Sequence, residues 1–317
     1  MYLGIDLGGI NIAVGLCDEN GKIVKKDSVP TGRTRSADLI VKDMAMLCKK
    51  VTEEAGFAIS DVKCIGIGAP GSPDAKEKRI LYCNNIESFT NLCIEKEPQK
   101  YFPDMPVYLE NDANAAAFGE IYAGAARKLN SAVIITLGTG VGSGVIIDKK
   151  IYSGSNNAAA EIGHMVISMG GEYCTCGRYG CFEAYASATA LIRQTKEKML
   201  KCPESKMHDL VKSLDDVNGK TSFDAAQMGD KAAKEVVDKY IEYLGVGIAN
   251  VINIFQPEAV VIGGGVSKQG EYLLAPLREY VRKNSYGLPD KPVDIIAAEL
   301  GNDAGIIGAA MLFTQYK

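Results

Sequence analysis

Apolar and polar positions follow two different periods along this chain. Close to the start, three short apolar runs are separated by a glycine pair and a polar turn, and they predict strands at residues 2–7, 12–17 and 22–27. Much later, apolar residues recur at alternating spacings of four and three, which predicts one long helix. The residues of this stripe are Val237, Ile241, Leu244, Ile248, Val251 and Phe255. Strands and helices mixed in this way indicate an α/β protein.

The same patterns predict the other elements. We expect further strands at 63–67, 107–109, 131–137, 143–148, 151–152 and 259–262. We expect further helices at about 36–56, at about 113–126, from about 270, and at 303–317. The plan of strand, glycine turn, strand, turn and strand that begins at residue 2 returns at residue 131. Such a weak internal repeat indicates two related domains.

Composition and charge exclude several classes of protein. The chain has 317 residues, 47% of them apolar and 23% charged, and these values are ordinary for a globular protein of about two domains. The 35 basic and 39 acidic residues give a net charge of −4, so we expect no nucleic-acid partner, which would favour a basic stripe. No apolar run reaches about 18 residues, and the start shows no basic region followed by an apolar one. We therefore expect a cytoplasmic protein with no membrane partner.

Three glycine-rich turns, each at the end of an apolar strand, are the first sign of chemistry. They are Gly8-Gly9, residues 138–142 and residues 263–265. Glycine lets the backbone approach a ligand closely and present N–H groups to phosphate oxygens. One such turn alone would be interpreted as a hairpin, but three in one chain favour phosphate binding. The common nucleotide motifs do not fit, because a strand follows the first two turns and Gly219-Lys220-Thr221 lacks the first glycine of a P-loop.

Four residues in the middle of the chain have side chains that bind metal ions: His164, Cys174, Cys176 and Cys181. One imidazole and three thiolates suit tetrahedral Zn²⁺, but the spacing is not that of paired CxxC motifs. From the spacing alone, zinc and free thiols are equally open. In a reducing compartment such a cluster favours a metal over a disulfide. Other cysteines lie in apolar surroundings and are interpreted as small buried hydrophobes: Cys17, Cys48, Cys64, Cys83 and Cys93.

Six segments, in this order, resemble those of the ROK family (repressors, open reading frames, kinases). They are residues 6–11 (DLGGIN), 110–112 (END), 137–142 (LGTGVG), 161–164 (EIGH), 174–183 (CTCGRYGCFE) and 261–266 (VIGGGV). The resemblance covers almost the whole chain and is closest to the family's sugar kinases of the glucokinase type, within the superfamily of actin and hexokinase. The stretch from Glu161 to Glu183 is the most specific. The chain departs from the pattern at Ile10, where the family usually has threonine, so backbone N–H groups must suffice there.

The resemblance implies an α/β fold of two ribonuclease-H-like (actin-like ATPase) domains that flank a cleft. We expect a small domain of residues 1–112 and 303–317, and a large domain of residues 113–302 that carries the zinc loop. The implied activity is ATP-dependent phosphorylation of the 6-hydroxyl of a hexose, with glucose as the first expectation, Mg²⁺ as a cofactor and a homodimer as the assembly. Kinases of N-acetylmannosamine, N-acetylglucosamine, allose or fructose are alternatives, because the family motifs contact hydroxyls that these sugars share.

The resemblance also assigns roles to residues. Asp112 is the expected catalytic base, although a lone aspartate before a helix would be interpreted as an N-cap. Residues expected at the sugar are Gly71, Asn85 (or its neighbour Asn84), Asn111, Asp112, Glu161, His164 and Glu183. Residues expected at ATP and Mg²⁺ are Asp6, Gly8, Gly9, Ile10, Asn11, Gly138, Thr139, Gly140, Gly264 and Gly265. A structural Zn²⁺ is expected on His164, Cys174, Cys176 and Cys181, and one nitrogen of His164 would bind zinc while the other faces the sugar.

Two other classes of function are alternatives. A sugar-responsive transcriptional regulator belongs to the same family, but it needs an N-terminal DNA-binding domain, for which a first strand at Tyr2 leaves no room. An actin-like or chaperone ATPase shares the phosphate turns, but it has no use for the sugar and zinc stretch from Glu161 to Glu183.

Overall fold

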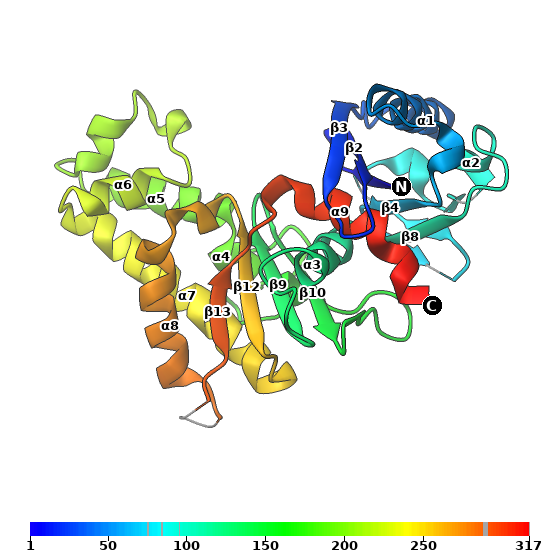
Figure 1. The fold of residues 1–317 in the computed structure, drawn as a ribbon. Coiled ribbons are helices and arrows are strands. Elements are labelled where there is room, and N and C mark those ends of the chain that lie inside the picture. Colours follow the sequence, from blue (N-terminus) through cyan, green and yellow to red (C-terminus); the bar gives the residue numbers. More distant parts are fainter. Residues whose placement is uncertain (75, 84, 95, 288–290, 317) are drawn as a thin grey trace. The chain divides into compact units, whose positions relative to one another are not determined.

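The computed structural model describes residues 1–74, 76–83, 85–94, 96–287 and 291–316 (Figure 1). Contacts between residues divide the chain into two compact units. Unit 1 comprises Met1–Ala132, Gly144–Ala160 and Glu299–Lys317, and unit 2 comprises Val133–Ser143 and Glu161–Ala298. The domain boundaries expected from the sequence, 1–112 with 303–317 and 113–302, stay a prediction.

The main sheet of unit 1 has five strands in the order β3-β2-β1-β4-β8. Its strands are β1 (Tyr2–Leu7), β2 (Asn11–Cys17), β3 (Ile23–Pro30), β4 (Ile65–Ala69) and β8 (Val107–Asn111). The first three are antiparallel neighbours, and β4 and β8 continue the sheet parallel to β1. The apolar side chains of β1 and β4 are almost completely buried, which is why these strands appear in the sequence as short apolar runs.

Helix α9 (Ala304–Met311) comes from the far end of the chain and packs against this sheet, and a 3₁₀ helix at Leu312–Tyr316 follows it. Two strand glycines permit this approach. A Cβ atom on Gly4 would lie 1.9 Å from the carbonyl oxygen of Ile306, and one on Gly66 would lie 1.7 Å from that of Ala309. Any side chain at Gly4 or Gly66 would therefore push α9 off the sheet.

Helix α3 (Asp112–Tyr122) packs against α9, and again a glycine marks the closest contact: a Cβ atom on Gly308 would lie 1.7 Å from the carbonyl oxygen of Ala115. Helix α1 (Ala37–Glu54) packs on β2 and β3. Unit 1 also contains the short helix α2 (Lys96–Gln99) and a three-stranded sheet of β5 (Ser72–Asp74), β6 (Arg79–Tyr82) and β7 (Leu92–Cys93). The sequence patterns did not predict these short elements.

The helix predicted over 113–126 ends at Tyr122, and the side chain of Glu120 gives the reason. Its carboxylate is buried and accepts hydrogen bonds from the N–H groups of Ala125 at 2.8 Å, Glu299 at 3.2 Å and Leu300 at 2.8 Å. A buried carboxylate needs such donors. The chain therefore turns around Glu120 after α3, and the same carboxylate holds the segment that leads into α9.

A second sheet repeats the strand plan of the first, in the order β11-β10-β9-β12-β13. Its strands are β9 (Ala132–Leu137), β10 (Val141–Ile147), β11 (Lys150–Ile151), β12 (Ala259–Gly264) and β13 (Asp294–Ala297). The division between the units passes through β10. In both sheets three consecutive strands are followed by two later ones, and this confirms the internal repeat and the α/β fold with two ribonuclease-H-like sheets. β13 was not predicted from the sequence.

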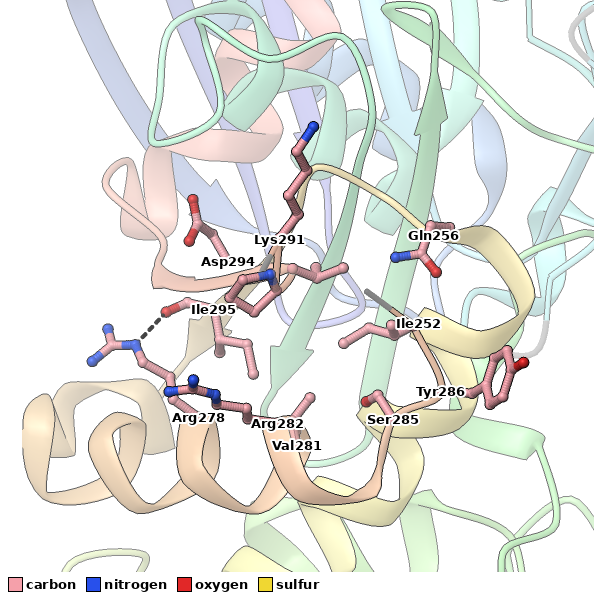
Figure 2. A pocket seen from close by; sticks show the side chains of 13 residues that line it. Ile252, Gln256, Arg278, Val281, Arg282, Ser285, Tyr286, Lys291, Asp294 and Ile295 are labelled. Carbon is pink, nitrogen blue, oxygen red and sulfur yellow. Dashed lines mark hydrogen bonds between the residues drawn. The ribbon is translucent and has the colours of Figure 1, made fainter. Parts of the chain in front are cut away.

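Five helices complete the described part of unit 2. They are α4 (Glu183–Ala186), α5 (Ala188–Lys201), α6 (Thr221–Gln227), α7 (Lys231–Phe255) and α8 (Glu271–Asn284). The predicted apolar stripe lies on α7, where every member is buried except the half-buried Phe255. The ends of α7 and α8 and the start of β13 surround a pocket (Figure 2). In the described ranges, no helix is long and apolar enough to cross a membrane.

Candidate functional site

Two carboxylates that were predicted from the sequence lie near each other in unit 1. Asp6 is the penultimate residue of β1, and Asp112 is the first residue of α3. Burial, together with the negative charge of Asp112, raises the pKa of Asp6 to about 6. A Cβ atom on Gly305 would lie 2.8 Å from the carboxyl group of Asp6, so α9 closes the other side of this residue. Two acidic groups held together in this way suit a divalent cation or a proton transfer.

Asn111, and not Asp112, is the N-cap of α3. Its Oδ1 accepts hydrogen bonds from the N–H groups of Ala113 at 2.9 Å and Asn114 at 3.1 Å. Its Nδ2 donates to the carbonyl oxygen of Gly71 at 3.1 Å, which brings two of the predicted sugar residues together. The N-cap interpretation of Asp112 is therefore wrong, because the neighbouring amide already satisfies the first turn of the helix.

Glu110 is a residue whose role the sequence did not reveal. It is buried, and burial raises the pKa of its carboxyl group. The carboxyl oxygen Oε1 accepts hydrogen bonds from the N–H of Asn111 at 2.9 Å and from Nδ2 of Asn114 at 3.1 Å. Glu110 thus fixes the backbone between β8 and α3, the same segment that carries Asn111 and Asp112.

The first glycine turn joins β1 to β2, and Thr31 donates hydrogen bonds to two of its carbonyl groups. The N–H of Gly8 donates to the carbonyl oxygen of Asn11 at 2.9 Å. Thr31 is fully buried, and its hydroxyl donates to the carbonyl oxygen of Gly8 at 2.6 Å while its N–H donates to that of Ile10 at 2.8 Å. Ile10 itself is 82% exposed. No sequence signal pointed to Thr31, since it lies 21 residues beyond the turn that it supports.

Asn85 lies against the first glycine turn. A Cβ atom on Gly9 would lie 3.4 Å from the Cβ atom of Asn85. The structure therefore brings a predicted sugar residue and a predicted phosphate residue into contact. The alternative to Asn85, its neighbour Asn84, lies outside the described residues.

The second glycine turn, residues 138–142, is tied to the helices that follow the cysteine cluster. Its own backbone closes with a hydrogen bond from the N–H of Gly138 to the carbonyl oxygen of Gly140 at 3.0 Å. The hydroxyl of Thr189 donates to the carbonyl oxygen of Thr139 at 2.8 Å. Glu183 Oε2 accepts from the N–H of Val141 at 2.9 Å. This turn therefore has its shape fixed by side chains from α4 and α5.

The third glycine turn lies beside the second. Gly264 has φ of +84°, a conformation that favours glycine, and a Cβ atom on it would lie 2.5 Å from the carbonyl oxygen of Leu137, directly before Gly138. Gly265 has no described atom within 4 Å of its Cβ position. After this turn a 3₁₀ helix at Val266–Gln269 leads to α8. The second and third turns follow strands of the same sheet, and their backbone is open at Gly138 and at Gly265.

The four predicted metal ligands come together in unit 2. The ligand atoms of His164, Cys174, Cys176 and Cys181 all lie within 4.8 Å of one another. The Sγ of Cys174 is 3.6 Å from Nδ1 of His164, and the Sγ atoms of Cys176 and Cys181 are also 3.6 Å apart. A tetrahedral zinc ion with Zn–S near 2.3 Å would place neighbouring ligand atoms about 3.5–3.8 Å apart. A disulfide needs about 2.05 Å between sulfurs. The cluster is thus compatible with a structural metal.

The three thiols of the cluster differ in their pKa. Hydrogen bonds from Arg178 lower the pKa of Cys176 to about 6, which favours the thiolate that a metal requires. Burial raises the pKa of Cys174, and it raises that of Cys181 to about 12, so these two thiols would lose their protons to a bound metal and not before it. An N–H of the Arg178 guanidinium also donates to the carbonyl oxygen of His164 at 2.8 Å. Because Nδ1 of His164 faces Cys174, its Nε2 is left for another partner. The remaining histidine, His208, is exposed, as its polar surroundings indicated.

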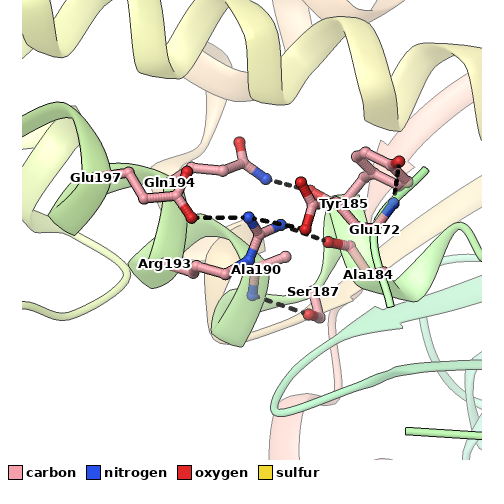
Figure 3. A network of polar contacts seen from close by, with 8 residues as sticks. All are labelled: Glu172, Ala184, Tyr185, Ser187, Ala190, Arg193, Gln194 and Glu197. Atoms are coloured by element: carbon pink, nitrogen blue, oxygen red, sulfur yellow. Dashed lines mark hydrogen bonds and ion pairs between the residues drawn. The ribbon is translucent and has the colours of Figure 1, made fainter. Parts of the chain in front are cut away.

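A network of polar contacts joins Glu172, just before Cys174, to helices α4 and α5 (Figure 3). The hydroxyl of Tyr185 accepts a hydrogen bond from the N–H of Glu172 at 2.7 Å. Arg193 pairs with the carboxylate of Glu172 at 3.3 Å and with that of Glu197 at 2.9 Å, and donates to the carbonyl oxygen of Ala184 at 3.0 Å. Glu183, Ala184 and Tyr185 are consecutive in α4, so this network holds the helix that carries Glu183.

The predicted sugar residues are divided between the two units. Gly71, Asn85, Asn111 and Asp112 belong to unit 1, and Glu161, His164 and Glu183 belong to unit 2. Glu161 is exposed at the start of the 3₁₀ helix Ile162–His164. Within unit 2, the Sγ of Cys174 lies 3.6 Å from His164 and 3.7 Å from Oε1 of Glu183, so one cysteine links both residues.

Comparisons with known proteins agree with these motifs. A family model described as the ROK family matches residues 2–316. A glucokinase of Thermotoga maritima is 38% identical over 99% of this chain and 97% of its own length. The crystal structure of a ROK family glucokinase from Streptomyces griseus in complex with glucose and AMPPNP is 37% identical, with a TM-score of 0.81 and 98% of both chains covered. A xylose repressor of Caldicellulosiruptor bescii is 29% identical over 96% of this chain and 76% of the repressor.

Proposed function

Because the chain belongs to the ROK family, we propose that it is a glucokinase that transfers the γ-phosphoryl group of ATP to the 6-hydroxyl of glucose. The observation that carries the proposal is its full-length similarity to glucokinases, which reaches 38% identity and includes a structure with glucose and an ATP analogue. The xylose repressor is a more distant relative at 29% identity. All of the motif segments quoted above are present in this chain in the family's order.

In this proposal, Asp112 accepts the proton of the sugar hydroxyl. Phosphoryl transfer needs little from the protein beyond positioning, charge stabilisation and a carboxylate that orients the nucleophile. Asp112 lies at the N-terminus of α3, where the helix dipole favours the ionised carboxylate. Asp6 is proposed to hold Mg²⁺ through water, and the cation would offset the burial and the repulsion by Asp112 that together raise the pKa of Asp6.

The hydroxyls of glucose are proposed to pair with Asn111, Glu161, His164 and Glu183, with the backbone at Gly71 and with Asn85. Asn111 Oδ1 is already used twice as a cap, so its contribution is the second hydrogen of Nδ2. His164 is proposed to donate or accept through Nε2, because Nδ1 faces the cysteines. These groups offer both donors and acceptors, as a polyhydroxyl ligand requires.

ATP is proposed to bind through the backbone N–H groups of the glycine turns, with the adenosine near Gly264 and Gly265. The turn residues Gly8, Gly9, Ile10 and Asn11, and Gly138, Thr139 and Gly140, are proposed to contact the phosphates. Thr31 binds the carbonyl groups of Gly8 and Ile10, and the N–H of Gly8 already donates to Asn11, so the N–H groups proposed to meet phosphate in the first turn are those of Gly9 and Ile10.

A structural Zn²⁺ is proposed on His164, Cys174, Cys176 and Cys181. Four protein ligands close a zinc site, so this ion would stabilise the loop and not activate water. The ion would fix the orientation of the His164 ring. It would also hold Cys174 in place beside the carboxylate of Glu183. We also propose a homodimer, which light scattering would detect as about twice the chain mass of 33.9 kDa.

The experiment that tests the proposal is a set of parallel kinase assays. Purified protein is supplied with ATP and Mg²⁺ and with glucose, N-acetylmannosamine, N-acetylglucosamine, allose or fructose, and ADP release is measured. We expect the highest kcat/KM with glucose. A higher value with another sugar would move the chain to that substrate, and no sugar-dependent turnover with any of them would contradict a kinase.

A further inference from the structure

Thr31, which comes directly after β3, makes two hydrogen bonds to the first glycine turn. Its hydroxyl donates to the carbonyl oxygen of Gly8 at 2.6 Å, and its N–H donates to that of Ile10 at 2.8 Å. Thr31 is fully buried, so water does not compete for either bond. One residue therefore fixes two peptide groups of a turn that is proposed to contact ATP.

The bond from the Thr31 hydroxyl also sets the direction of an N–H group. A trans peptide group is planar, and its C=O and N–H point in opposite directions. The carbonyl group of Gly8 and the N–H of Gly9 belong to the same peptide group, so this N–H is turned away from Thr31. Among the described residues, the N–H groups of Gly9 and Ile10 have no hydrogen-bond acceptor. Both N–H groups are therefore available to a ligand.

Arg35 in turn holds the backbone of Thr31. Its guanidinium donates to the carbonyl oxygen of Thr31 from Nε at 3.2 Å and from Nη2 at 2.7 Å. The same Nη2 lies 2.8 Å from a carboxylate oxygen of Asp43 in α1. The N–H of Arg35 donates to the carbonyl oxygen of Gly32 at 2.8 Å, which closes the chain turn between the two residues. Thr31 is thus connected to helix α1 through Arg35.

Thr52 offers a comparison within the same unit. It is also buried, and its hydroxyl donates to the carbonyl oxygen of Cys48 at 2.8 Å. Both of these residues belong to α1, so the bond stabilises a helix and involves no residue proposed to bind ATP. Loss of the hydroxyl from Thr31 or from Thr52 should lower stability in a similar way, but only Thr31 acts on the glycine turn.

We propose that Thr31 is a positioning residue for ATP, and that it holds the first turn so that the N–H groups of Gly9 and Ile10 face the phosphate oxygens. The proposal rests on the proposed function, which makes ATP the ligand of this turn. Donors that are fixed before the ligand arrives need no rearrangement on binding, so they bind an anion more tightly. Without the hydroxyl, the peptide group between Gly8 and Gly9 is free to rotate and to turn its N–H away from the ligand. Arg35 contributes by holding Thr31.

Calorimetric titration of the full chain with AMPPNP and Mg²⁺, and separately with glucose, tests this proposal. Thr31→Val replaces the hydroxyl by a methyl group, and it should weaken AMPPNP binding by about fivefold or more, the effect of about one lost hydrogen bond to a charged group. Thr31→Ser keeps the hydroxyl and should bind AMPPNP within about twofold of the parent. Thr52→Val is the matched control and should also stay within about twofold. Glucose binding should be unchanged in all three variants.

A second pair of variants decides the question if Thr31→Val does not fold. Arg35→Met removes both bonds to the Thr31 carbonyl from a half-buried position, and it should weaken AMPPNP binding by about two- to fourfold. Arg127→Met is its control, because Arg127 makes the same kinds of contact elsewhere in unit 1, to the carbonyl oxygen of Gly124 at 2.8 Å and to the carboxylate of Glu299 at 2.6 Å. This control removes the same charge and should leave AMPPNP binding unchanged.

The role of Thr31 is overturned if folded Thr31→Val binds AMPPNP as tightly as the parent does, or if Thr31→Ser binds it as weakly as Thr31→Val. It is also overturned if Thr31→Val weakens glucose and AMPPNP equally, which would indicate a general loosening of the fold. The titrations need no turnover. A parent that binds AMPPNP but phosphorylates no sugar would therefore contradict the proposed function and not the role of Thr31.

Discussion

The carboxylate of Glu183 accepts a hydrogen bond from the backbone N–H of Val141, with 2.9 Å between Oε2 and N. It lies so close to the second glycine turn that a Cβ atom on Gly140 would be 2.3 Å from Oε2. A proposed sugar ligand and a proposed phosphate turn are therefore packed together. Gly138, in the same turn, has no described atom within 4 Å of its Cβ position. The two glycines thus allow separate tests of the two substrates.

Gly138→Ala should weaken ATP binding and leave glucose binding unchanged. The added methyl group meets open space in the protein, so the fold should be kept, but it occupies the surface that the phosphates would approach. We expect the KM for ATP to rise by about tenfold or more. Gly140→Ala should raise the KM for both substrates, because its methyl group displaces Glu183. Steady-state kinetics with each substrate varied in turn would decide, and a parental KM for ATP in Gly138→Ala would remove this turn from the nucleotide site.

Cys176→Ser should remove bound zinc and lower stability together. Atomic emission on the parent protein should find about one zinc per chain, because four ligands converge here and binding a structural zinc contributes to folding. Cys202→Ser changes a cysteine outside the cluster and should keep both the metal and the melting temperature. Metal content and thermal unfolding are measured on the same preparations. A parent that is stable and active with no metal bound would contradict the zinc site.

Gly66→Ala should destabilise the protein although it adds only one methyl group. Its Cβ atom would lie 1.7 Å from the carbonyl oxygen of Ala309, and backbone of a buried helix cannot move aside cheaply. Overpacking of this kind costs about 1–3 kcal/mol or more. Gly219→Ala is the control, because no described atom lies within 4 Å of its Cβ position, and it should change stability by less than about 1 kcal/mol. Urea unfolding of both variants tests this, and equal stabilities would show that α9 does not pack closely on β4.

Local periodicity was enough to predict the long strands and helices, but not the contacts between distant segments. The stripe from Val237 to Phe255 identified α7, because burial of one helix face leaves a regular pattern. By contrast, Thr31 and Glu120 act on segments far away in the chain, and their residue types carry no mark of those partners. The short strand β13 was missed as well, because its apolar residues are a single isoleucine pair followed by alanine.

The sequence predicted which residue types belong to the candidate site, and the structure decided one alternative that the sequence left open, the N-cap of α3. The cysteine cluster could be identified because metal ligands must be particular residues at short spacings. The cap of α3 could not be assigned, since both Asn111 and Asp112 are good N-cap residues and only the backbone geometry separates them. That assignment matters for the chemistry, because a residue that caps the helix has less freedom to serve a substrate.

Asp6→Asn should change how stability depends on pH. The pKa of Asp6 is raised from 3.8 to about 6 in the folded protein, so the folded state holds this proton more tightly than the unfolded chain does. The resulting stabilisation is complete below the unfolded pKa and is lost as the pH rises through about 6. Asparagine stays neutral, so the variant should gain stability over the parent as the pH rises, by up to about 3 kcal/mol at 1.36 kcal/mol per pKa unit.

The measurement for Asp6 is urea unfolding between about pH 4.5 and pH 8, with a chelator present so that no Mg²⁺ neutralises the carboxylate. The difference between variant and parent should be smallest at the acidic end, grow as the pH rises through about 6 and level off above about pH 7. Curves for the two proteins that stay parallel across this range would show that Asp6 is not buried beside a second charge.

Asp112→Asn should abolish most of the activity without disturbing the fold. Asparagine keeps the shape of the side chain but cannot accept the proton of the sugar hydroxyl, and general-base contributions are about 10²–10⁴-fold, so kcat should fall by that factor. Helix α3 should stay intact, because Asn111 supplies the cap through Oδ1, and stability should change by less than about 1 kcal/mol or rise slightly as the charge beside Asp6 is removed.

Asn111→Ala gives the opposite pattern: it loses the cap and should cost about 1 kcal/mol of stability, with a higher KM for glucose and a smaller effect on kcat. Measuring kcat and the free energy of unfolding on the same preparations separates the two residues. A near-parental kcat for Asp112→Asn would mean that another group takes the proton, since the structure already excludes the role of N-cap for Asp112.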